Sequence, residues 1–315
     1  MERWQLQQRQ SLPLEAKIVL TKVRIRDWYE HFDGNVYVAF SGGADSTVLL
    51  NLVRSMYGND VPAVFCDTGL EFPEIREFVK TFENVVWLKP KLNFREVLDK
   101  YGYPVISKEQ SQYIKEYRNA SPTSKMRDRR LGIYLDGSGG GNKFRGTISK
   151  KHRYLINAPF KISDVCCKIM KKQPSELYER ASGRSVILGN MAADSNLRFS
   201  QYLKTGCNAF DSVRPTSKPM AFWTKEDVWT YLKSQSATMP NGCGSGVNNY
   251  CSIYDKGYER TGCVFCLYGV ETINGSERLN KFQLLKRTHS KLFDYCMNEL
   301  GMAEVCEYIG INISD

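Results

Sequence analysis

A short apolar run followed by a loop of small residues constrains the fold more than any other part of the chain. Residues 36–40 are apolar and rich in β-branched and aromatic side chains, which is typical of a buried strand. Small residues interrupt this run, and further apolar residues after the loop predict a helix. The loop residues that we expect to bind a ligand are Ser41, Gly42, Gly43, Asp45 and Ser46.

The order of strand, glycine turn and helix predicts an anion site at this loop. The backbone N–H groups at the start of a helix point toward one spot, and the helix dipole favours negative charge there. Glycine lets the backbone approach a phosphate group because it has no Cβ atom. An ordinary strand–turn–helix without a ligand is the alternative. The two adjacent glycines, with serines on both sides, favour a site for nucleotide phosphates.

Further apolar runs predict more strands of the same sheet. They alternate with predicted helices, so the order indicates an α/β fold with a parallel, doubly wound sheet. The expected strands are 61–66, 85–88 and 186–189, with helices at about 14–32 and 75–82 and another starting at Thr224. Ligands of such sheets lie at the carboxyl ends of the strands, where Ser41 and Asp67 fall.

The chain of 315 residues is long enough for an α/β core with an additional part. Its 42% of hydrophobic and 25% of charged residues are typical of a soluble protein. We find no apolar run of membrane-spanning length and no signal peptide, and so we expect no membrane contact and a cytoplasmic location. We divide the chain into an N-terminal helix (1–33), an α/β domain (34–240) and a cysteine-bearing C-terminal region (241–315).

A basic insert at about 118–153 interrupts the α/β pattern around a glycine run at 137–141. Its periodicity is poor, and we interpret part of it as a mobile loop. Together with the net charge of +10, it favours a nucleic acid partner. A solvated basic surface is the alternative. The basic side chains are Lys125, Arg127, Arg129, Arg130, Lys143, Arg145, Lys150, Lys151, His152 and Arg153.

Two cysteine pairs indicate a metal centre. Ten cysteines in a cytoplasmic chain argue for metal binding or reactive thiols rather than for disulfides. Cys166 and Cys167 are adjacent, and Cys263 and Cys266 form a Cys-x-x-Cys pair. Four thiolates suit tetrahedral zinc or a 4Fe-4S cluster, and the spacing does not separate the two. Two unrelated buried pairs are the remaining alternative.

The loop residues carry a family resemblance. Residues 41–46 match the SGGxDS pyrophosphate loop of the ATP pyrophosphatases, or adenine nucleotide α-hydrolases, which are Rossmann-like. This resemblance implies that ATP is split between its α- and β-phosphates with Mg²⁺ present. It also implies the following roles: the amides of 42–46 and the hydroxyls of Ser41 and Ser46 hold pyrophosphate, Asp45 holds Mg²⁺, Asp67 and Gly189 lie near the nucleotide, and Arg198 neutralises the α-phosphate.

Other segments resemble the phosphoadenosine phosphosulfate (PAPS) reductase-like family. Residues 67–74 resemble its DTGxxFPE segment, and 166–174 resemble the CCxxRKxxP segment of the adenylylsulfate reductases. Further matches are GxRxx(E/Q)SxxR at 189–198 and KPIxxWTxxDVWxYI at 218–232. Met170 and Met191 stand where those patterns have arginine. The resemblance runs from about 36 to 270 and does not account for the basic insert.

The cluster motif implies a cofactor. In the adenylylsulfate reductases, the adjacent pair and a later Cys-x-x-Cys hold a 4Fe-4S cluster. By resemblance, Cys166, Cys167, Cys263 and Cys266 would hold one here, with zinc as the alternative. Cys251 would be the substitute if only one cysteine of the adjacent pair is a ligand.

Two departures from the reductases bear on the reaction. Those enzymes usually have a degenerate phosphate loop, whereas residues 41–46 keep the full signature. They also end in a cysteine nucleophile segment, which residues 305–310 do not match. We therefore expect an ATP-dependent sulfurtransferase that adenylates its acceptor, with nucleic acid as acceptor and a sulfur-donor protein as partner. The alternatives are a sulfonucleotide (PAPS or APS) reductase and a non-catalytic nucleotide- and nucleic-acid-binding subunit.

Overall fold

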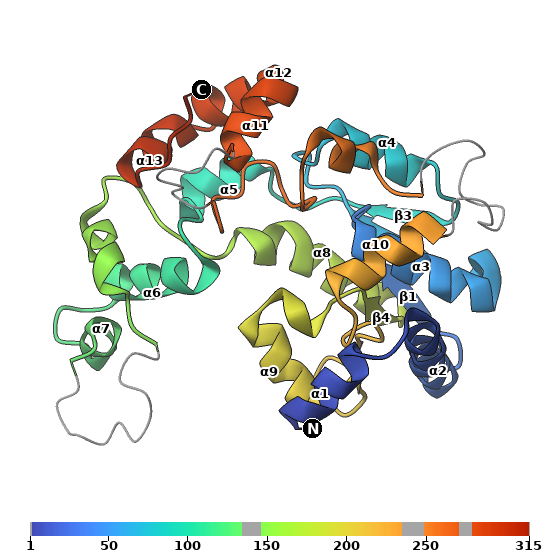
Figure 1. The fold of residues 1–315 in the computed structure, drawn as a ribbon. Coiled ribbons are helices and arrows are strands. Elements are labelled where there is room, and N and C mark those ends of the chain that lie inside the picture. Colours follow the sequence, from blue (N-terminus) through green and yellow to red (C-terminus); the bar gives the residue numbers. More distant parts are fainter. Residues whose placement is uncertain (1, 134–145, 235–248, 271–278, 315) are drawn as a thin grey trace. The chain divides into compact units, whose positions relative to one another are not determined.

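The computed structural model describes residues 2–133, 146–234, 249–270 and 279–314 (Figure 1). The chain forms two compact units. The first, which we call the sheet unit, contains Met1–Asp67, Glu71–Lys89 and Gln173–Thr261. The second, which we call the helical unit, contains Thr68–Leu70, Pro90–Lys172 and Gly262–Asp315.

The sheet unit contains the six named strands and several helices. The strands are β1 (Val36–Ala39), β2 (Ala63–Cys66), β3 (Val85–Leu88), β4 (Ser185–Leu188), β5 (Asn208–Ala209) and β6 (Thr216–Ser217). The helices are α1 (Arg3–Gln10), α2 (Leu14–His31), α3 (Ala44–Tyr57), α4 (Pro73–Lys80), α8 (Gln173–Ser182), α9 (Asn196–Thr205) and α10 (Lys225–Ser234). Three short 3-10 turns are η1 (Gly58–Asp60), η4 (Ala192–Asp194) and η5 (Ser252–Lys256).

The strand order is β3-β2-β1-β4-β6-β5. All neighbouring pairs are parallel except β5 and β6. The first three strands follow one another in one direction, and β4 then pairs with the other side of β1. The strand order therefore reverses between β1 and β4, which is the position where open α/β sheets bind ligands. The expected α/β fold with a doubly wound, mostly parallel sheet is confirmed.

Side chains cover the sheet on both faces. Alternate residues of a strand point to opposite faces. Tyr37, Val64 and Val186 form one buried group, against which Tyr178 of α8 packs. Val38 and Ile187, which occupy the alternate positions of β1 and β4, are fully buried as well. Neither face of the central strands is therefore left to solvent, as the continuous apolar runs in the sequence require.

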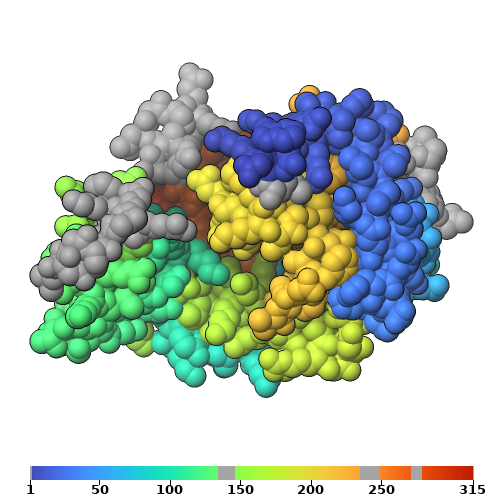
Figure 2. Space-filling model, turned by 90° about the horizontal axis from the view of Figure 1, so that it is seen from below, coloured from blue at the N-terminus to red at the C-terminus, as the bar shows by residue number. Residues whose placement is uncertain are grey.

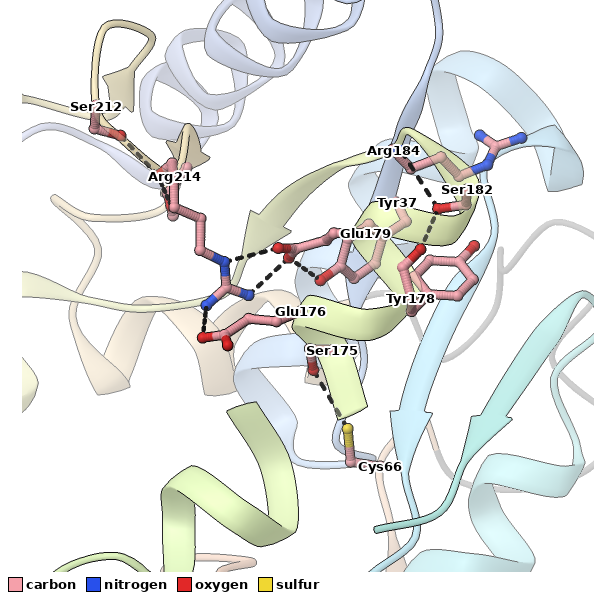
Figure 3. A network of polar contacts seen from close by, with 11 residues as sticks. Tyr37, Cys66, Ser175, Glu176, Tyr178, Glu179, Ser182, Arg184, Ser212 and Arg214 are labelled. Carbon is pink, nitrogen blue, oxygen red and sulfur yellow. Dashed lines mark hydrogen bonds and ion pairs between the residues drawn. The ribbon is translucent and has the colours of Figure 1, made fainter. Parts of the chain in front are cut away.

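A polar network holds α8 against the sheet (Figure 3). The Tyr37 hydroxyl donates to the Glu179 carboxylate at 2.7 Å. The Arg214 guanidinium donates to both oxygens of Glu179, at 2.7 and 2.8 Å. Burial and the Glu179 carboxylate both raise the pKa of Tyr37, so its hydroxyl stays protonated as a donor. These bonds join α8 to β1 through Tyr37 and to the segment just before β6 through Arg214.

The N-terminal helices belong to the sheet unit. Helix α1 lies beside α9 (Figure 1), and in Figure 2 the dark blue start of the chain lies next to the yellow segment. Arg9 of α1 donates to the Tyr202 hydroxyl of α9 at 2.8 Å, and the Arg3 guanidinium lies 5.7 Å from the centroid of the Phe199 ring. The predicted N-cap of α10 is confirmed: Thr224 N donates to the Asp227 carboxylate at 2.7 Å, and Asp227 N donates to the Thr224 hydroxyl at 3.3 Å.

The helical unit consists of helices and turns joined by loops. They are α5 (Phe94–Tyr101), α6 (Lys108–Asn119), α7 (Lys125–Leu131), the 3-10 segment η2 (Lys150–Asn157), the π-helical turn η3 (Lys168–Lys172), α11 (Lys281–Thr288), α12 (Ser290–Asp294), the π-helical turn η6 (Tyr295–Glu299) and α13 (Met302–Tyr308). None of the helices in the described part of the chain is long and apolar enough to cross a bilayer.

The units differ from the domains that we expected from the sequence. Residues 90–172, which we placed in the α/β domain, belong to the same unit as residues 262–315, whereas residues 241–261 belong to the sheet unit. One reason is Tyr103, whose side-chain hydroxyl donates to Leu300 O at 2.9 Å. Within the insert, α7 begins at a Ser124 cap and ends at Gly132 in the left-handed region, so this part is helical.

Candidate active site

The loop after β1 is held by its own hydroxyl groups. The Ser46 hydroxyl accepts from Ser41 N at 3.2 Å and donates to Gly43 O at 2.9 Å. The Ser41 and Ser46 oxygens lie 3.1 Å apart. Thr47 donates to the same Gly43 carbonyl at 3.0 Å. These bonds define the turn before any ligand enters, and Ser41 remains exposed at its rim.

The two glycines of the loop are required for different reasons. Gly42 has φ of +70°, a conformation that side chains other than glycine rarely adopt. A Cβ atom on Gly42 would also lie 3.0 Å from Val79 and 3.1 Å from Ile75. A Cβ atom on Gly43 would lie 2.5 Å from the Thr261 hydroxyl oxygen. From the sequence, we expected glycine at these positions because a phosphate approaches the backbone. The structure adds a second reason, which is the close packing of other protein atoms.

Gly189 follows β4 at the reversal of strand order. A Cβ atom here would lie 3.0 Å from Asp45 O, so the two backbone segments touch. Asp67 ends β2 at the same edge of the sheet, because β2 runs parallel to β1. Its buried carboxylate accepts from the Arg76 guanidinium of α4 at 2.9 Å. The structure therefore brings the predicted residues Ser41, Gly189 and Asp67 to one edge.

Charged side chains surround Asp45. Burial and, to a smaller extent, the neighbouring Asp194 carboxylate raise the pKa of Asp45 to about 6. Three cations lower it in part: Arg198, Lys225 and Arg260. Arg198 pairs with Asp194, which also accepts from Met191 N at 3.1 Å. The predicted residue Arg198 is thus within electrostatic reach of the loop, in a group with two carboxylates.

Four residues near the loop were not predicted from the sequence. Lys225 and Arg260 supply positive charge to Asp45. The Tyr254 hydroxyl accepts from Ala44 N at 2.8 Å, and Thr261 approaches Gly43. Lys225 lies inside the segment at 218–232 that we matched, which was a usable signal. The other three lie in a turn-rich segment with no motif, and only the fold brings them to the loop.

The four predicted cysteine ligands lie in the helical unit and act on one another. Cys166 donates to the Cys167 sulfur at 4.0 Å. This donation lowers the pKa of Cys167 and raises that of Cys166, and the charges of Lys171, Lys108 and Lys172 also lower the pKa of Cys167. Cys263 and Cys266 are within electrostatic reach of Cys166. The structure thus brings the two pairs together.

Two polar groups near these cysteines fit an anionic cofactor. Lys281 Nζ donates to Cys263 O at 2.6 Å and to Cys266 O at 3.3 Å, which places an ammonium group on the Cys-x-x-Cys turn. The Tyr268 hydroxyl is buried and has no hydrogen-bond partner within the described residues. The Ser111 hydroxyl lies near Tyr268, but it accepts from Val105 N and donates to Val105 O. A buried donor of this kind is costly unless it has an acceptor, and a thiolate cluster would supply one.

A single metal ion places a stricter demand on ligands. Zinc–sulfur bonds of about 2.3 Å in a tetrahedron hold the sulfur atoms about 3.8 Å apart. Within the described residues, no group of three or more His, Cys, Asp or Glu side chains is arranged to hold one ion. The donor set of four thiols with nearby cations fits a 4Fe-4S cluster, which has an anionic, thiolate-bound surface.

Three other cysteines have different surroundings. Cys251, the suggested substitute ligand, belongs to the sheet unit and is buried, near Glu74, Asp255 and Lys256. Cys296 and Cys306 are fully buried in the helical unit, and burial raises the pKa of each to about 12. A thiol of this kind is neutral at physiological pH, which agrees with our interpretation of both as packing residues.

The basic insert uses several of its cations internally. Arg130 is buried, pairs with Glu116 and donates to Gly146 O at 2.6 Å. Arg153 donates to Leu131 O at 2.6 Å. In contrast, Lys125, Arg129, Lys150 and Lys151 are exposed. The glycine run at 137–141 and the cations Lys143 and Arg145 lie outside the described residues.

One family model matches the part of the chain that contains both the loop at 41–46 and the cysteine cluster. Residues 35–268 match the model of the phosphoadenosine phosphosulfate reductase domain. The chain belongs to this family. The matched range includes the phosphate loop, the strand-order reversal and the four clustered cysteines of this PAPS reductase domain protein.

The relatives with curated records are uncharacterized. The chain is 25% identical over 281 residues to one protein of Methanocaldococcus jannaschii, covering 88% of this chain and 43% of that protein. It is 28% identical over 252 residues to a second protein of the same organism, and this match covers 77% of this chain and 44% of that protein. The chain thus spans under half the length of these relatives. A solved structure, the phosphate complex of the Candida auris PAPS reductase, has 14% identity and a TM-score of 0.42, with 84% of this chain and 96% of that chain covered.

Proposed function

We propose that this PAPS reductase-family chain is an ATP pyrophosphatase-type sulfurtransferase. An acceptor oxygen attacks the α-phosphorus of ATP, the bond to the β-phosphate breaks, and pyrophosphate leaves. A sulfur nucleophile then replaces the AMP group on the acceptor. The observation that supports this most is the intact hydroxyl-braced loop at the strand-order reversal, with three cations within electrostatic reach of Asp45.

The loop suits the leaving pyrophosphate. The backbone amides of 42–46 and the hydroxyls of Ser41 and Ser46 are donors at the start of a 14-residue helix, where an anion is favoured. Arg198, Lys225 and Arg260 add positive charge that offsets the charge developing on the phosphate groups. Asp45 would be a ligand of Mg²⁺, because magnesium prefers carboxylate oxygens beside substrate phosphates. Asp67 and Gly189 would border the nucleotide from the neighbouring strands.

The cysteine cluster (Cys166, Cys167, Cys263 and Cys266) would hold the 4Fe-4S cofactor. Such a group, when bound, supplies redox chemistry or an iron site that carries sulfur. The chain's own residues would tune it: the cationic side chains of Lys171 and Lys281 stabilise anionic charge on the thiolates, and the Tyr268 hydroxyl donates into the site. The buried, neutral thiols of Cys296 and Cys306 give the reductase alternative no evident C-terminal nucleophile.

A nucleic acid acceptor is supported by the exposed cations of the insert. Lys125, Arg129, Lys150 and Lys151 present positive charge to solvent and, within the described residues, make none of the bonds that hold Arg130. Phosphate backbones bind such groups by releasing counterions. A separate sulfur-donor protein would then supply the sulfur atom.

The test is the product of nucleotide cleavage. We expect AMP and pyrophosphate when the chain is incubated anaerobically with ATP, Mg²⁺ and total cellular nucleic acid. Ser46→Ala removes the hydroxyl that would turn from Gly43 O to the charged pyrophosphate. A hydrogen bond to a charged group is worth about 1.5–3 kcal/mol, and so we expect a loss of about 10- to 150-fold. The matched control is Ser55→Ala on the same helix, where the hydroxyl only donates to Leu52 O.

Each possible product decides between functions. ADP and phosphate would contradict the α–β cleavage. Sulfite from added PAPS or APS with a thiol reductant, with no cleavage of ATP, would establish the reductase alternative. Nucleotide binding with neither reaction would support the non-catalytic subunit. Thermal unfolding of both serine variants shows whether Ser46→Ala acts through the site or through the fold.

A further inference from the structure

A segment of the sheet unit that no predicted motif includes lies over the phosphate loop. It comprises residues 250–261 and includes η5. Tyr254 Oη accepts from Ala44 N at 2.8 Å. From the same segment, the Thr261 hydroxyl lies 2.5 Å from the position that a Gly43 Cβ atom would take. Two hydroxyl groups thus contact two adjacent residues of the loop. We call this segment the cover.

The contact to Ala44 occupies a group that a phosphate needs. Ala44 is the first residue of α3, so its N–H has no partner inside the helix. Helix N-termini bind phosphates through such free N–H groups. We propose that the Tyr254 hydroxyl is a built-in competitor for the phosphate loop, which a phosphate group of the ligand must displace. This inference rests on the phosphate site of the proposed function and concerns its regulation.

The cover is anchored away from the loop. The Tyr254 and Tyr250 rings contact the Trp229 ring edge to face, with centroids 5.0 and 5.3 Å apart. Lys256 pairs with Glu74 of α4, and the Tyr258 ring packs on Phe72 at 4.6 Å. These contacts hold the segment in place without using the loop amides. Displacement of the Tyr254 hydroxyl therefore breaks one hydrogen bond to the loop and leaves the contacts of Tyr250, Lys256 and Tyr258 intact.

The cover also carries a group that attracts the ligand. Arg260 directly precedes Thr261, and its charge acts on Asp45 of the loop. A phosphate at the loop would thus meet a cation from the same segment whose tyrosine it displaces. A neutral molecule gains nothing from Arg260 and cannot replace the Tyr254 hydroxyl as a charged acceptor does. The arrangement favours anionic ligands over neutral nucleosides.

The experiment uses inorganic pyrophosphate as the probe and calorimetry as the measurement. Tyr254→Phe removes the competing hydroxyl and keeps the ring on Trp229. One hydrogen bond contributes about 0.5–1.5 kcal/mol net, so we expect pyrophosphate to bind about 2- to 10-fold more tightly. Tyr250→Phe is the matched control: its ring contacts the same tryptophan, but its hydroxyl bonds Asp255, and its affinity should be unchanged. In the ligand-free protein, Tyr254→Phe should also speed hydrogen exchange at the Ala44 amide.

The outcomes are separable from those of the proposed function. Unchanged or weaker pyrophosphate binding in Tyr254→Phe would overturn the competitor role, and an equal gain in Tyr250→Phe would also do so. If Ser46→Ala weakens pyrophosphate binding to the otherwise unaltered chain, the phosphate site stands whatever Tyr254 does. If neither the unaltered chain nor Tyr254→Phe binds pyrophosphate, both proposals fail.

Discussion

The phosphate loop and the cysteine cluster differ in how far along the chain their contacts reach. The side-chain bonds that brace the loop join residues up to five positions apart. The cysteine cluster joins two pairs that lie about 100 positions apart in the sequence. The conformation of the loop is therefore set by neighbouring residues, whereas the cysteine cluster forms only when the helical unit has folded.

This difference has consequences for the energetics of each site. The loop keeps its turn without a ligand, because Ser46 and Thr47 satisfy Gly43 O and Ser46 accepts from Ser41 N. The cysteine cluster gathers thiols, a cation and an unpaired buried hydroxyl, which are costly together without a cofactor. We therefore expect the cluster to respond to the loss of one residue in an all-or-none way, and the loop to respond in graded steps.

The largest expected effect is the loss of iron from the cysteine cluster. After anaerobic reconstitution, the unaltered chain should contain about four iron atoms and as many sulfides. Cys263→Ala removes one of four thiolate ligands and should bring the iron content and the brown colour close to zero. Iron and sulfide analysis with visible absorption measures both.

Two matched cysteine variants sharpen this comparison. Cys296→Ala makes the same chemical change at a buried thiol of the same unit and should keep the iron. Cys251→Ala should also keep it, because the charged groups that act on Cys251 are Glu74, Asp255 and Lys256 rather than the clustered cysteines. Loss of iron in Cys251→Ala with retention in Cys166→Ala would make Cys251 the ligand in place of Cys166. Stoichiometric zinc without iron would replace the cluster by a structural zinc site.

A graded effect is expected at the loop as the pH falls. The pKa of Asp45 is raised to about 6, so at pH 7 the carboxylate is mostly ionised and can hold Mg²⁺. At pH 5 only about a tenth remains ionised, and kcat/KM for ATP cleavage should fall about tenfold between pH 7 and 5. A profile that stays flat over this range would contradict the role of Asp45.

The same shift has a consequence for stability with the opposite sign. Because the folded-state pKa lies above the ordinary value of 3.8, ionisation of Asp45 costs stability as the pH rises through about 4 to 6. Asp45→Asn should therefore stabilise the protein at pH 7, by about 1–3 kcal/mol, and have little effect at pH 4. Asp67→Asn is the contrast, since it breaks the ion pair between the buried Asp67 carboxylate and the partly exposed Arg76 guanidinium and should lower the melting temperature.

The sequence predicted the parts of the structure that short segments encode. The strand at 85–88 has the expected bounds and the one at 36–40 is one residue shorter, because each is a β-branched, apolar run between turn residues. The helix α7 was missed although its local signals, Ser124 and Gly132, were present, because the surrounding charges hid its periodicity. The Tyr254 contact could not be predicted, since 210 positions separate it from Ala44 and no spacing rule connects them.

The last expected effect concerns the basic insert and tests whether it contacts a nucleic acid backbone. In the test variant, glutamine replaces the exposed residues Lys125, Arg129, Lys150 and Lys151. Arg130 stays unchanged, because its bonds to Glu116 and Gly146 O support the fold. The control is an equal change at four exposed lysines elsewhere, Lys91, Lys100, Lys204 and Lys291. Binding of duplex DNA and of single-stranded RNA is measured against salt concentration.

If each of the four insert cations neutralises a phosphate, the slope of log affinity against log salt should become less steep by about 3 to 4 for duplex DNA. The loss should be alike for all sequences, since phosphate contacts carry no base information. Release of pyrophosphate from ATP should survive the change, because the loop is braced by its own residues. Equal slopes in the insert and control variants would mean that the net charge alone attracts nucleic acid, and the acceptor would then have to be sought among small molecules.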